Sequence, residues 1–297
     1  MDRIRPALPI LAAIGGVACL SLMDAFMKGA ALAVGAFSAA WLRAVLGTAI
    51  AAPLWLWRVR RRPGAAALRL HVERGVVSTF MALSFFYALT KLPIAETIAI
   101  SFVAPLITLY LARLFLGEQI RRSAVVGSIM GFCGTLVIIG GKVGRGNFDA
   151  DTGLGLAAIL FSACLYAYNF IVIRKQSQAA GPEEIALFHS GVSALILGVA
   201  APFLLTMPDA AIMGDLAIAA LLTVLGALAI AWAYAREEAQ VLVPMEYTGF
   251  LWAALFGWLF FREAVSITSV AGTACIVAGC WIAVRGPRAA KPEQAAI

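Results

Sequence analysis

The sequence predicts an all-α integral membrane protein, with ten transmembrane helices arranged as two inverted repeats of five around a central cavity. Composition is the first observation behind this fold class. Of 297 residues, 62% are hydrophobic and 13% are charged, and the mean hydropathy is +0.92. Such a chain has too little polar surface to cover a water-soluble globule. The second observation is a match between the two halves of the chain at a displacement of 145 residues.

This displacement keeps cysteine, glutamate and glycine in register, which carries more weight than matches between alanine and leucine. The peptide LAAI of 11–14 also recurs at 156–159. The matching pairs are Cys19 with Cys164, Glu118 with Glu263, Gly127 with Gly272, and Gly134 with Gly279. No insertion separates the halves. We therefore predict one five-helix repeat over 1–146 and a second over 147–297.

Long apolar runs separated by short polar punctuation fill almost the whole sequence. A bilayer crossing needs about 20 apolar residues, so each half has room for five crossings. The predicted spans are 8–27, 37–57, 75–91, 94–116, 122–141, 153–173, 184–206, 214–234, 241–261 and 265–284. The first span follows Arg3 and Arg5 as a signal peptide would, but nine spans come after it and we expect it to be retained.

An odd number of spans per repeat determines the relative orientation of the halves. A five-span unit begins on one side of the bilayer and ends on the other, so the second copy enters in reverse. Two such halves, related by an axis in the membrane plane, have two nearly equivalent packings, each open to one side. The repeat therefore predicts alternating access, the mechanism of secondary transporters.

Lysine and arginine are unevenly distributed between the two predicted sides. Seventeen of the 23 lie on the side of the termini, five lie on the other side, and Arg43 lies inside the second span. The cluster at 58–62 is the densest. The positive-inside rule therefore places both termini in the cytoplasm, in the inner membrane of a bacterium. Since the basic residues sit in short loops at span ends, the net charge of +7 does not indicate nucleic-acid binding.

The sequence shows no sign of a metal, a cofactor or a catalytic loop domain. All five cysteines lie in apolar spans, with no CxxC and no histidine at ligand spacing. No connecting segment is long enough to fold as a soluble domain. The predicted partners are a small-molecule substrate and the lipid bilayer, and we expect a monomer.

Ionisable side chains at membrane depth point to functional sites, because burying them in lipid is costly. Asp24 has two interpretations: an ion pair with Lys28 one turn later, or a position facing the cavity, opposite its repeat mate Asn169. For Glu246, a bound ammonium or proton and an interhelical hydrogen bond are equally plausible. His189 either carries a proton or packs as a neutral residue.

Four further acidic or basic positions are expected to be structural. Arg43 requires a carboxylate or carbonyl partner, and Glu96 is expected near the outer interface. The symmetric pair Glu118 and Glu263 is predicted to contact the free amides that open the next helix.

Aromatic side chains provide several stacking surfaces for an organic solute with an apolar body and a polar handle. Tyr166 and Asn169 share one helix face. The candidate substrate-binding residues are Asp24, Phe80, Tyr87, Ser101, Tyr166, Asn169, His189, Trp232, Glu246 and Tyr247. Pro105 and Pro244 each remove a helix hydrogen bond and are candidate hinges.

Several of these motifs together resemble the ten-span EamA type of the drug/metabolite transporter superfamily, over residues 8–284. The motifs are Tyr87-Ala88 with Trp232-Ala233, Val103-Ala104-Pro105-Leu106 leading to Phe115-Leu116-Gly117-Glu118, Phe260-Phe261-Arg262-Glu263, and the glycine-spaced fifth and tenth spans. The resemblance implies a central cavity lined by spans one, three, four, six, eight and nine. Thr248-Gly249 stands where many relatives carry a proline, which argues against a hinge at that position.

The expected function is export of small organic metabolites by alternating access. Amino acids are the expected substrates, with aromatic ones favoured because such a cavity resembles that of YddG-type exporters. One alternative is an importer of a vitamin or nucleotide-type metabolite. A channel or a non-transporting intramembrane enzyme are alternatives from other classes, but the sequence has neither a charged pore ring nor a paired-carboxylate or metal constellation.

Overall fold

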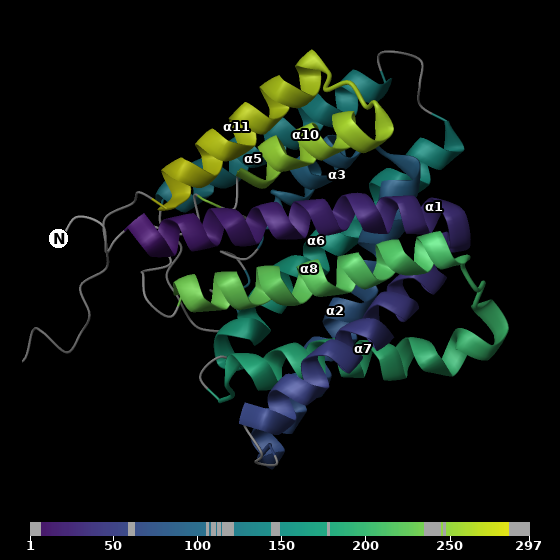
Figure 1. Ribbon diagram of the computed structural model, residues 1–297. Helices are drawn as coiled ribbons and strands as arrows, with labels where there is room; N and C mark the ends of the chain where they lie inside the picture. Colours follow the sequence, from purple (N-terminus) through teal and green to yellow (C-terminus); the bar gives the residue numbers. More distant parts are fainter. Residues whose placement is uncertain are drawn as a thin grey trace, which may run out of the picture.

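The structure, a computed structural model, describes residues 7–58, 63–104, 107, 111, 114, 122–143, 149–176, 179–234, 245 and 248–284. These residues form helices and short connections, with no strand among them (Figure 1). The helices are α1 (Ala7–Arg58), α2 (Ala65–Lys91), α3 (Ile94–Ser101), α5 (Arg122–Val143), α6 (Ala150–Gln176), α7 (Pro182–Leu204), α8 (Ala210–Tyr234), α10 (Thr248–Phe261) and α11 (Ile267–Val284). The predicted all-α membrane fold is confirmed.

Helix α1 contains the first two predicted spans, joined without a loop. At Gly35 the backbone has φ 83° and ψ 152°. This conformation is not helical, and residues other than glycine rarely adopt it. Gly35 thus divides α1 into two arms, 7–34 and 36–58, which meet at an angle (Figure 1). These arms and the eight later helices fall on the ten predicted spans, as far as the described residues go.

Helix α2 begins earlier than the hydropathy pattern predicts. It starts at Ala65 instead of residue 75, so Arg69 and Arg74 belong to the helix and not to a loop. Basic residues lower the hydropathy of a segment without breaking a helix. The boundary expected at residue 75 is therefore wrong.

Two aspartates cap the helices that follow them. Asp149 Oδ1 accepts a hydrogen bond from Thr152 N at 2.7 Å at the start of α6, and Asp209 Oδ1 accepts one from Ile212 N at 2.8 Å at the start of α8. Such caps satisfy amides that have no partner within the helix. The bonds from Thr152 also lower the pKa of the Asp149 carboxyl below its ordinary value of 3.8.

The first arm of α1 pairs with α8, and α6 pairs with α2 in the same way. Gly16 lies against Ile230 and Leu20 against Gly226, so the first pair is antiparallel. In the second pair, Gly155 lies against Lys91 and Leu92, and Gln176 contacts His71. Adding 145 to the residue numbers of α1 and subtracting 145 from those of α8 gives the pairing observed between α6 and α2. This equivalence is expected for two repeats related by a twofold axis.

Helices α5 and α11 show the direction of that axis. The closest approaches to backbone atoms are Gly134 to the Gly272 carbonyl and Gly279 to the Gly127 carbonyl, so the two helices are antiparallel. They are also repeat mates. Two helices exchanged by a twofold axis run antiparallel only when the axis is perpendicular to them, which here means in the membrane plane. The inverted arrangement of the repeats therefore follows from the packing.

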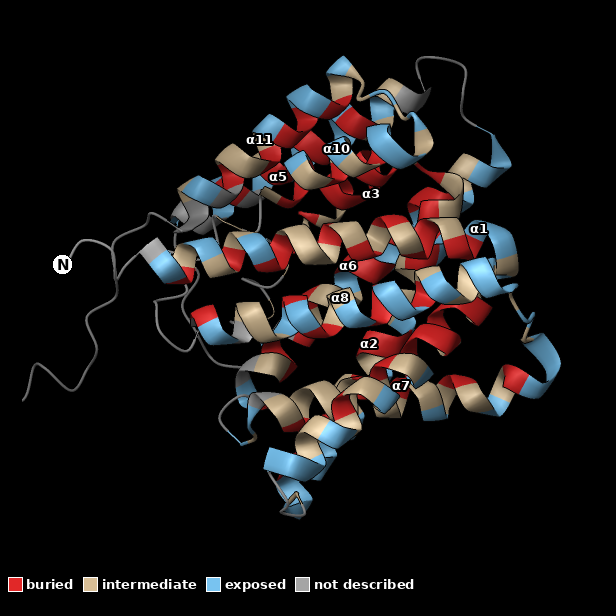
Figure 2. Ribbon diagram, in the orientation of Figure 1, coloured by how far each residue is buried: buried red, intermediate tan, exposed pale blue. Residues whose placement is uncertain are grey.

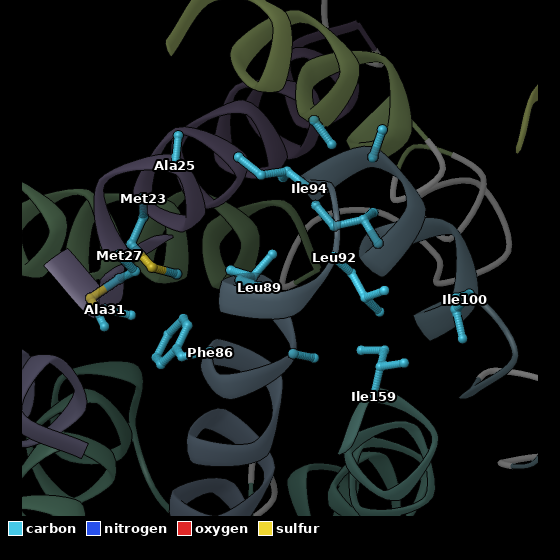
Figure 3. Packing of buried hydrophobic residues seen from close by; sticks show 14 of the residues in the cluster. Met23, Ala25, Met27, Ala31, Phe86, Leu89, Leu92, Ile94, Ile100 and Ile159 are labelled. Atoms are coloured by element: carbon cyan, nitrogen blue, oxygen red, sulfur yellow. The ribbon is translucent and has the colours of Figure 1, made fainter. Parts of the chain in front are cut away.

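The apolar core lies where α1, α2, α3 and α6 meet. Figure 3 shows Met23 and Met27 from α1 beside Phe86 and Leu89 from α2, with Ile159 from α6 nearby. Figure 2 shows buried positions where helices face one another and exposed positions on their outer sides. Many of the exposed side chains are large and apolar, including those at the end of α7. Five described helices are long and apolar enough to cross a membrane.

Candidate functional site

Buried and half-buried polar side chains gather between the two arms of α1 and helices α2, α6, α7 and α8. This set, called here the polar centre, comprises Asp24, Arg43, Arg74, Tyr166, Asn169, Gln176, His189 and Thr223. It contains four of the predicted substrate-binding residues: Asp24, Tyr166, Asn169 and His189. Polar groups at membrane depth are costly to bury, so a group of them between helices is a candidate substrate site.

Arg43 is held by contacts that are not ionic. Its guanidinium donates from Nη1 to Thr223 Oγ1 at 3.3 Å, and Cζ lies 5.4 Å from the centroid of the Phe86 ring. Only 7% of the residue is exposed, and Nε has no hydrogen-bond partner. Asp24 lies close enough to interact electrostatically with Arg43 but does not form an ion pair with it.

The predicted alternative that pairs Asp24 with Lys28 is wrong. Lys28 Nζ forms an ion pair with Glu263 and donates to the Leu92 carbonyl oxygen at 2.8 Å. Asp24 lies one turn earlier and belongs to the polar centre instead. Sequence spacing allowed the local pair, but the partner that Lys28 contacts is 235 residues away.

The other side of the polar centre is formed by α2, α6 and α7. Arg74 Nη1 donates to Gln176 Oε1 at 2.9 Å and its guanidinium interacts electrostatically with Tyr166 and His189. His189 Nδ1 and Asn169 Oδ1 are buried without a hydrogen-bond partner, and Asn169 is only 3% exposed. Buried polar atoms without partners are rare in native proteins and call for a ligand or water.

A buried histidine extends the polar centre toward the end of α2. His71 Nε2 lies 2.8 Å from Glu184 Oε1, and His71 Nδ1 lies 2.6 Å from Gln176 Nε2. Its ring stacks on Phe188 with centroids 4.5 Å apart. The sequence reasoning missed this cluster because it placed residue 71 in a loop. The polar side chains of Arg69, His71, Glu73 and Arg74 were available as a signal, since a helix there brings His71 and Arg74 onto one side.

At the opposite end, one ion pair ties together three segments. The Lys28 ammonium binds the Glu263 carboxylate and lies 5.2 Å from the Phe261 ring, while Glu263 Oε2 accepts from Ile94 N at 2.8 Å. Together with the Leu92 carbonyl, these groups form what is called here the outer latch, after the side of the membrane on which the predicted orientation places it. It joins the first arm of α1, the link between α2 and α3, and the end of α10.

The outer latch corrects one detail of the glutamate prediction. Glu263 does bind a free amide that opens a helix, but that helix is α3 and not the next one, α11. Arg262 turns the chain back with a positive φ of 54°, and this presents Glu263 to α3. The repeat mate Glu118 lies outside the described residues. The repeat mate of Lys28 is Ile173, so an inner counterpart lacks the ammonium group.

The remaining candidate residues are not brought together in the polar centre. Phe80, Tyr87 and Trp232 are exposed on α2 and α8, and Tyr87 lies 6.0 Å from Lys91 Nζ. Ser101 Oγ donates to the Ile98 carbonyl oxygen of its own helix at 2.7 Å. Four candidates lie outside the described residues: Glu246, Tyr247, Pro105 and Pro244.

Glu96 is more deeply buried than expected. It was predicted near the outer interface, but it is buried in the first turn of α3 and accepts a hydrogen bond from Ser269 Oγ at 3.1 Å. It thus connects α3 to α11. Among the described residues, no group of three or more histidine, cysteine or acidic side chains has the arrangement of a metal site.

Two inverted helical repeats with polar groups at their seam are the construction of many membrane transport proteins. The chain belongs to the EamA-like transporter family, whose model matches residues 7–140 and again 153–285. It is a multi-pass membrane transporter of small metabolites and not an enzyme.

Relatives with curated names support this class and differ in their substrates. A pseudopaline exporter of Pseudomonas aeruginosa is 25% identical over 91% of this chain and 94% of its own length. A riboflavin transporter of Brucella anthropi is 28% identical over 73% of this chain and 78% of its own length. An S-adenosylmethionine uptake transporter of Rickettsia felis is 24% identical over 86% of this chain and 85% of its own length.

A solved structure has the same fold. One crystal structure matches with a TM-score of 0.65 at 19% identity, over 93% of this chain and 96% of that chain. At this identity the likeness applies to the fold alone.

Proposed function

We propose that this protein exports amino acids, aromatic ones preferentially, from the cytoplasm of a bacterium by alternating access. The observation that carries the proposal is the polar centre, in which charged and amide groups lie beside the half-buried ring of Tyr166 at the seam of the repeats. A solute with an aromatic body and a polar head complements such a surface. The inverted repeat supports two packings that expose this surface alternately to each side.

The outer latch contributes to the proposed cycle by holding the outer end closed. Its ion pair joins the first arm of α1 to the ends of α3 and α10, which must separate for release to the outside. The corresponding inner position carries Ile173 in place of Lys28. The two ends are therefore closed by different chemistry.

Purified protein in liposomes tests the substrate and the direction. The assay compares efflux and uptake of radiolabelled phenylalanine, tryptophan, threonine and riboflavin with the same fluxes in empty liposomes. We expect flux of the aromatic amino acids above background. Flux of riboflavin alone would favour the alternative, a vitamin importer, which the named riboflavin transporters among the relatives support. Amino acid flux equal to background would contradict the proposal.

Single replacements test which helix faces bind the substrate. Tyr166→Ala and Asn169→Ala are expected to abolish flux, and Tyr87→Ala tests whether the exposed aromatic side chains take part. Trp57→Ala is the matched control, because Trp57 is an exposed aromatic residue at the end of α1. Folded protein is verified by size-exclusion chromatography. Wild-type rates in all the site variants would show that the binding faces are different ones.

The orientation of the protein is part of the proposal. Both termini are placed in the cytoplasm because seventeen basic residues lie on that side against five on the other. A C-terminal reporter that is fluorescent only in the cytoplasm and one that is active only outside it give opposite results for the two orientations. Activity of the external reporter would reverse the assignment.

A further inference from the structure

The register between α1 and α8 brings an acid and a base to one turn of α8. Gly16 lies against Ile230 and Leu20 against Gly226 in an antiparallel pair, and continuing this register places Asp24 level with Leu222, one residue before Thr223. Thr223 Oγ1 accepts the hydrogen bond from Arg43 Nη1 at 3.3 Å. Asp24 comes from the first arm of α1 and Arg43 from the second. The two charges therefore lie at the same turn of α8 and come from opposite arms.

These charges are held near each other without touching. Within the part of the chain that the structure describes, the ion pairs involve neither Asp24 nor Arg43. The guanidinium is retained by Thr223 and the Phe86 ring, and its Nε remains without a partner. Charged side chains at membrane depth usually pair with one another or with backbone carbonyls. A dipolar group bound to both would supply the ionic partner that each of these two side chains lacks among the described residues.

We infer that Asp24 and Arg43 form a socket for the zwitterionic head of the substrate. In this arrangement the Asp24 carboxylate binds the α-ammonium group and the Arg43 guanidinium binds the α-carboxylate. Arginine suits this role because its planar fork matches a carboxylate in two hydrogen bonds. The substrate class is thus an amino acid, or a larger metabolite that carries an amino acid group. This inference rests on the proposed transport function.

The socket exists in one repeat only. The repeat mate of Asp24 is Asn169 and that of Arg43 is Phe188, so the second repeat has an amide and a ring where the first has two charges. Thr223 corresponds to Ser78, which retains the hydroxyl group. When Asp24 and Arg43 bind the head of a substrate, the rest of the molecule contacts side chains of the second repeat, including Asn169 and Tyr166.

Binding is tested by thermal stabilisation of the purified full-length protein in detergent. The twenty common amino acids are screened, followed for phenylalanine by phenethylamine, which lacks the carboxylate, and 3-phenylpropionate, which lacks the amine. We expect the wild type to bind the zwitterion on the order of tenfold or more tightly than either analogue, because each loses a hydrogen-bonded charge pair.

Two substitutions should remove this discrimination in opposite ways. Arg43→Gln is expected to bind phenylalanine and phenethylamine equally, while Asp24→Asn is expected to bind phenylalanine and 3-phenylpropionate equally. Arg43→Lys keeps the charge and should retain part of the preference. Arg58→Gln is the control, since Arg58 is an exposed arginine at the far end of the same arm. A merely structural role for the pair would not produce the crossed pattern.

The outcomes separate the socket from the transport function. The socket is overturned if no amino acid stabilises the wild type, or if both substitutions weaken all three compounds equally. A crossed binding pattern without flux in liposomes supports the socket and contradicts the proposed transport. Amino acid flux without the crossed pattern supports transport and overturns the socket.

Discussion

The seam between α5 and α11 and the polar centre both contain repeat mates. The mates are identical at the seam and differ in the polar centre. At the seam, Gly127 and Gly272 are mates, as are Gly134 and Gly279, and all four remain glycine. In the polar centre, Asp24 is matched by Asn169. Backbone approach requires the same residue on both sides of the axis, whereas binding of an asymmetric molecule does not. The repeat is therefore preserved where it supports packing and has diverged where it supports recognition.

Breaking the seam should have the largest effect. A Cβ at Gly134 would lie 2.4 Å from the Gly272 carbonyl oxygen, and backbone atoms cannot move aside as a flexible side chain can. Gly134→Val is expected to prevent stable folding. Its destabilisation should exceed the usual overpacking cost of about 1–3 kcal/mol. Thermal unfolding in detergent measures the effect.

Gly140→Val is the matched control for the seam, because nothing lies within 4 Å of a Cβ at that position on the same helix. It should leave the melting temperature nearly unchanged. Equal destabilisation by the two substitutions would show that helix propensity, and not close approach, explains the glycines.

Breaking the outer latch should have the next largest effect. Lys28→Ile gives the outer end the residue found at the mate, Ile173, and leaves the Glu263 carboxylate without its cation. Removing one partner of a buried ion pair costs about 3 kcal/mol or more. We expect a lower melting temperature and greater labelling of an introduced cysteine at the outer end.

A double replacement sharpens the test of the latch. Lys28→Met with Glu263→Gln should recover part of the stability lost in Lys28→Met, because it removes the uncompensated charge. Losses that simply add would contradict a direct interaction.

Exchanging residues between the halves of the polar centre should affect transport more than stability. Asp24→Asn makes the two repeats alike and is expected to reduce amino acid flux on the order of tenfold or more. Asn169→Asp keeps the acid of the first repeat and should reduce flux less. Initial rates in liposomes give the comparison. A larger loss in Asn169→Asp would mean that transport depends more on the Asn169 amide than on the Asp24 carboxylate.

The smallest effect is expected for the exposed ion pair at the start of α6. Lys91 Nζ lies 2.9 Å from Asp151 Oδ1, but both side chains are accessible to solvent. Exposed pairs contribute little because water and salt screen them. Lys91→Met should therefore leave the melting temperature unchanged, in contrast to Lys28→Met at the same end of the molecule. A comparable loss would mean that the outer end depends on both pairs.

Local sequence signals predicted most of the helices but few of their contacts. Apolar runs placed α5 and α7 within two residues of their observed ends, because span length follows bilayer thickness. Hydropathy failed at the start of α2, where basic residues belong to a helix. Hydropathy also did not predict that Gly35 joins two spans without a loop.

The candidate functional residues were predicted by a different principle. The cost of burying charge singled out Asp24, Arg43 and His189, which do meet in the polar centre. It did not reveal His71, nor that Lys28 binds Glu263 and not Asp24. The roles of Glu246, Tyr247, Pro105 and Pro244, and the repeat boundary between 146 and 147, remain predictions.

Hydropathy and the 145-residue repeat were enough to predict a ten-span inverted fold, because both depend only on local composition and on counting crossings. The partners of individual charged side chains were decided by tertiary structure. Helices in lipid can pair in many registers of similar apolar contact, and small residues such as Gly16, Gly134 and Gly226 select among them by allowing backbones to approach. Only that selection brings Asp24, Arg43 and Thr223 together.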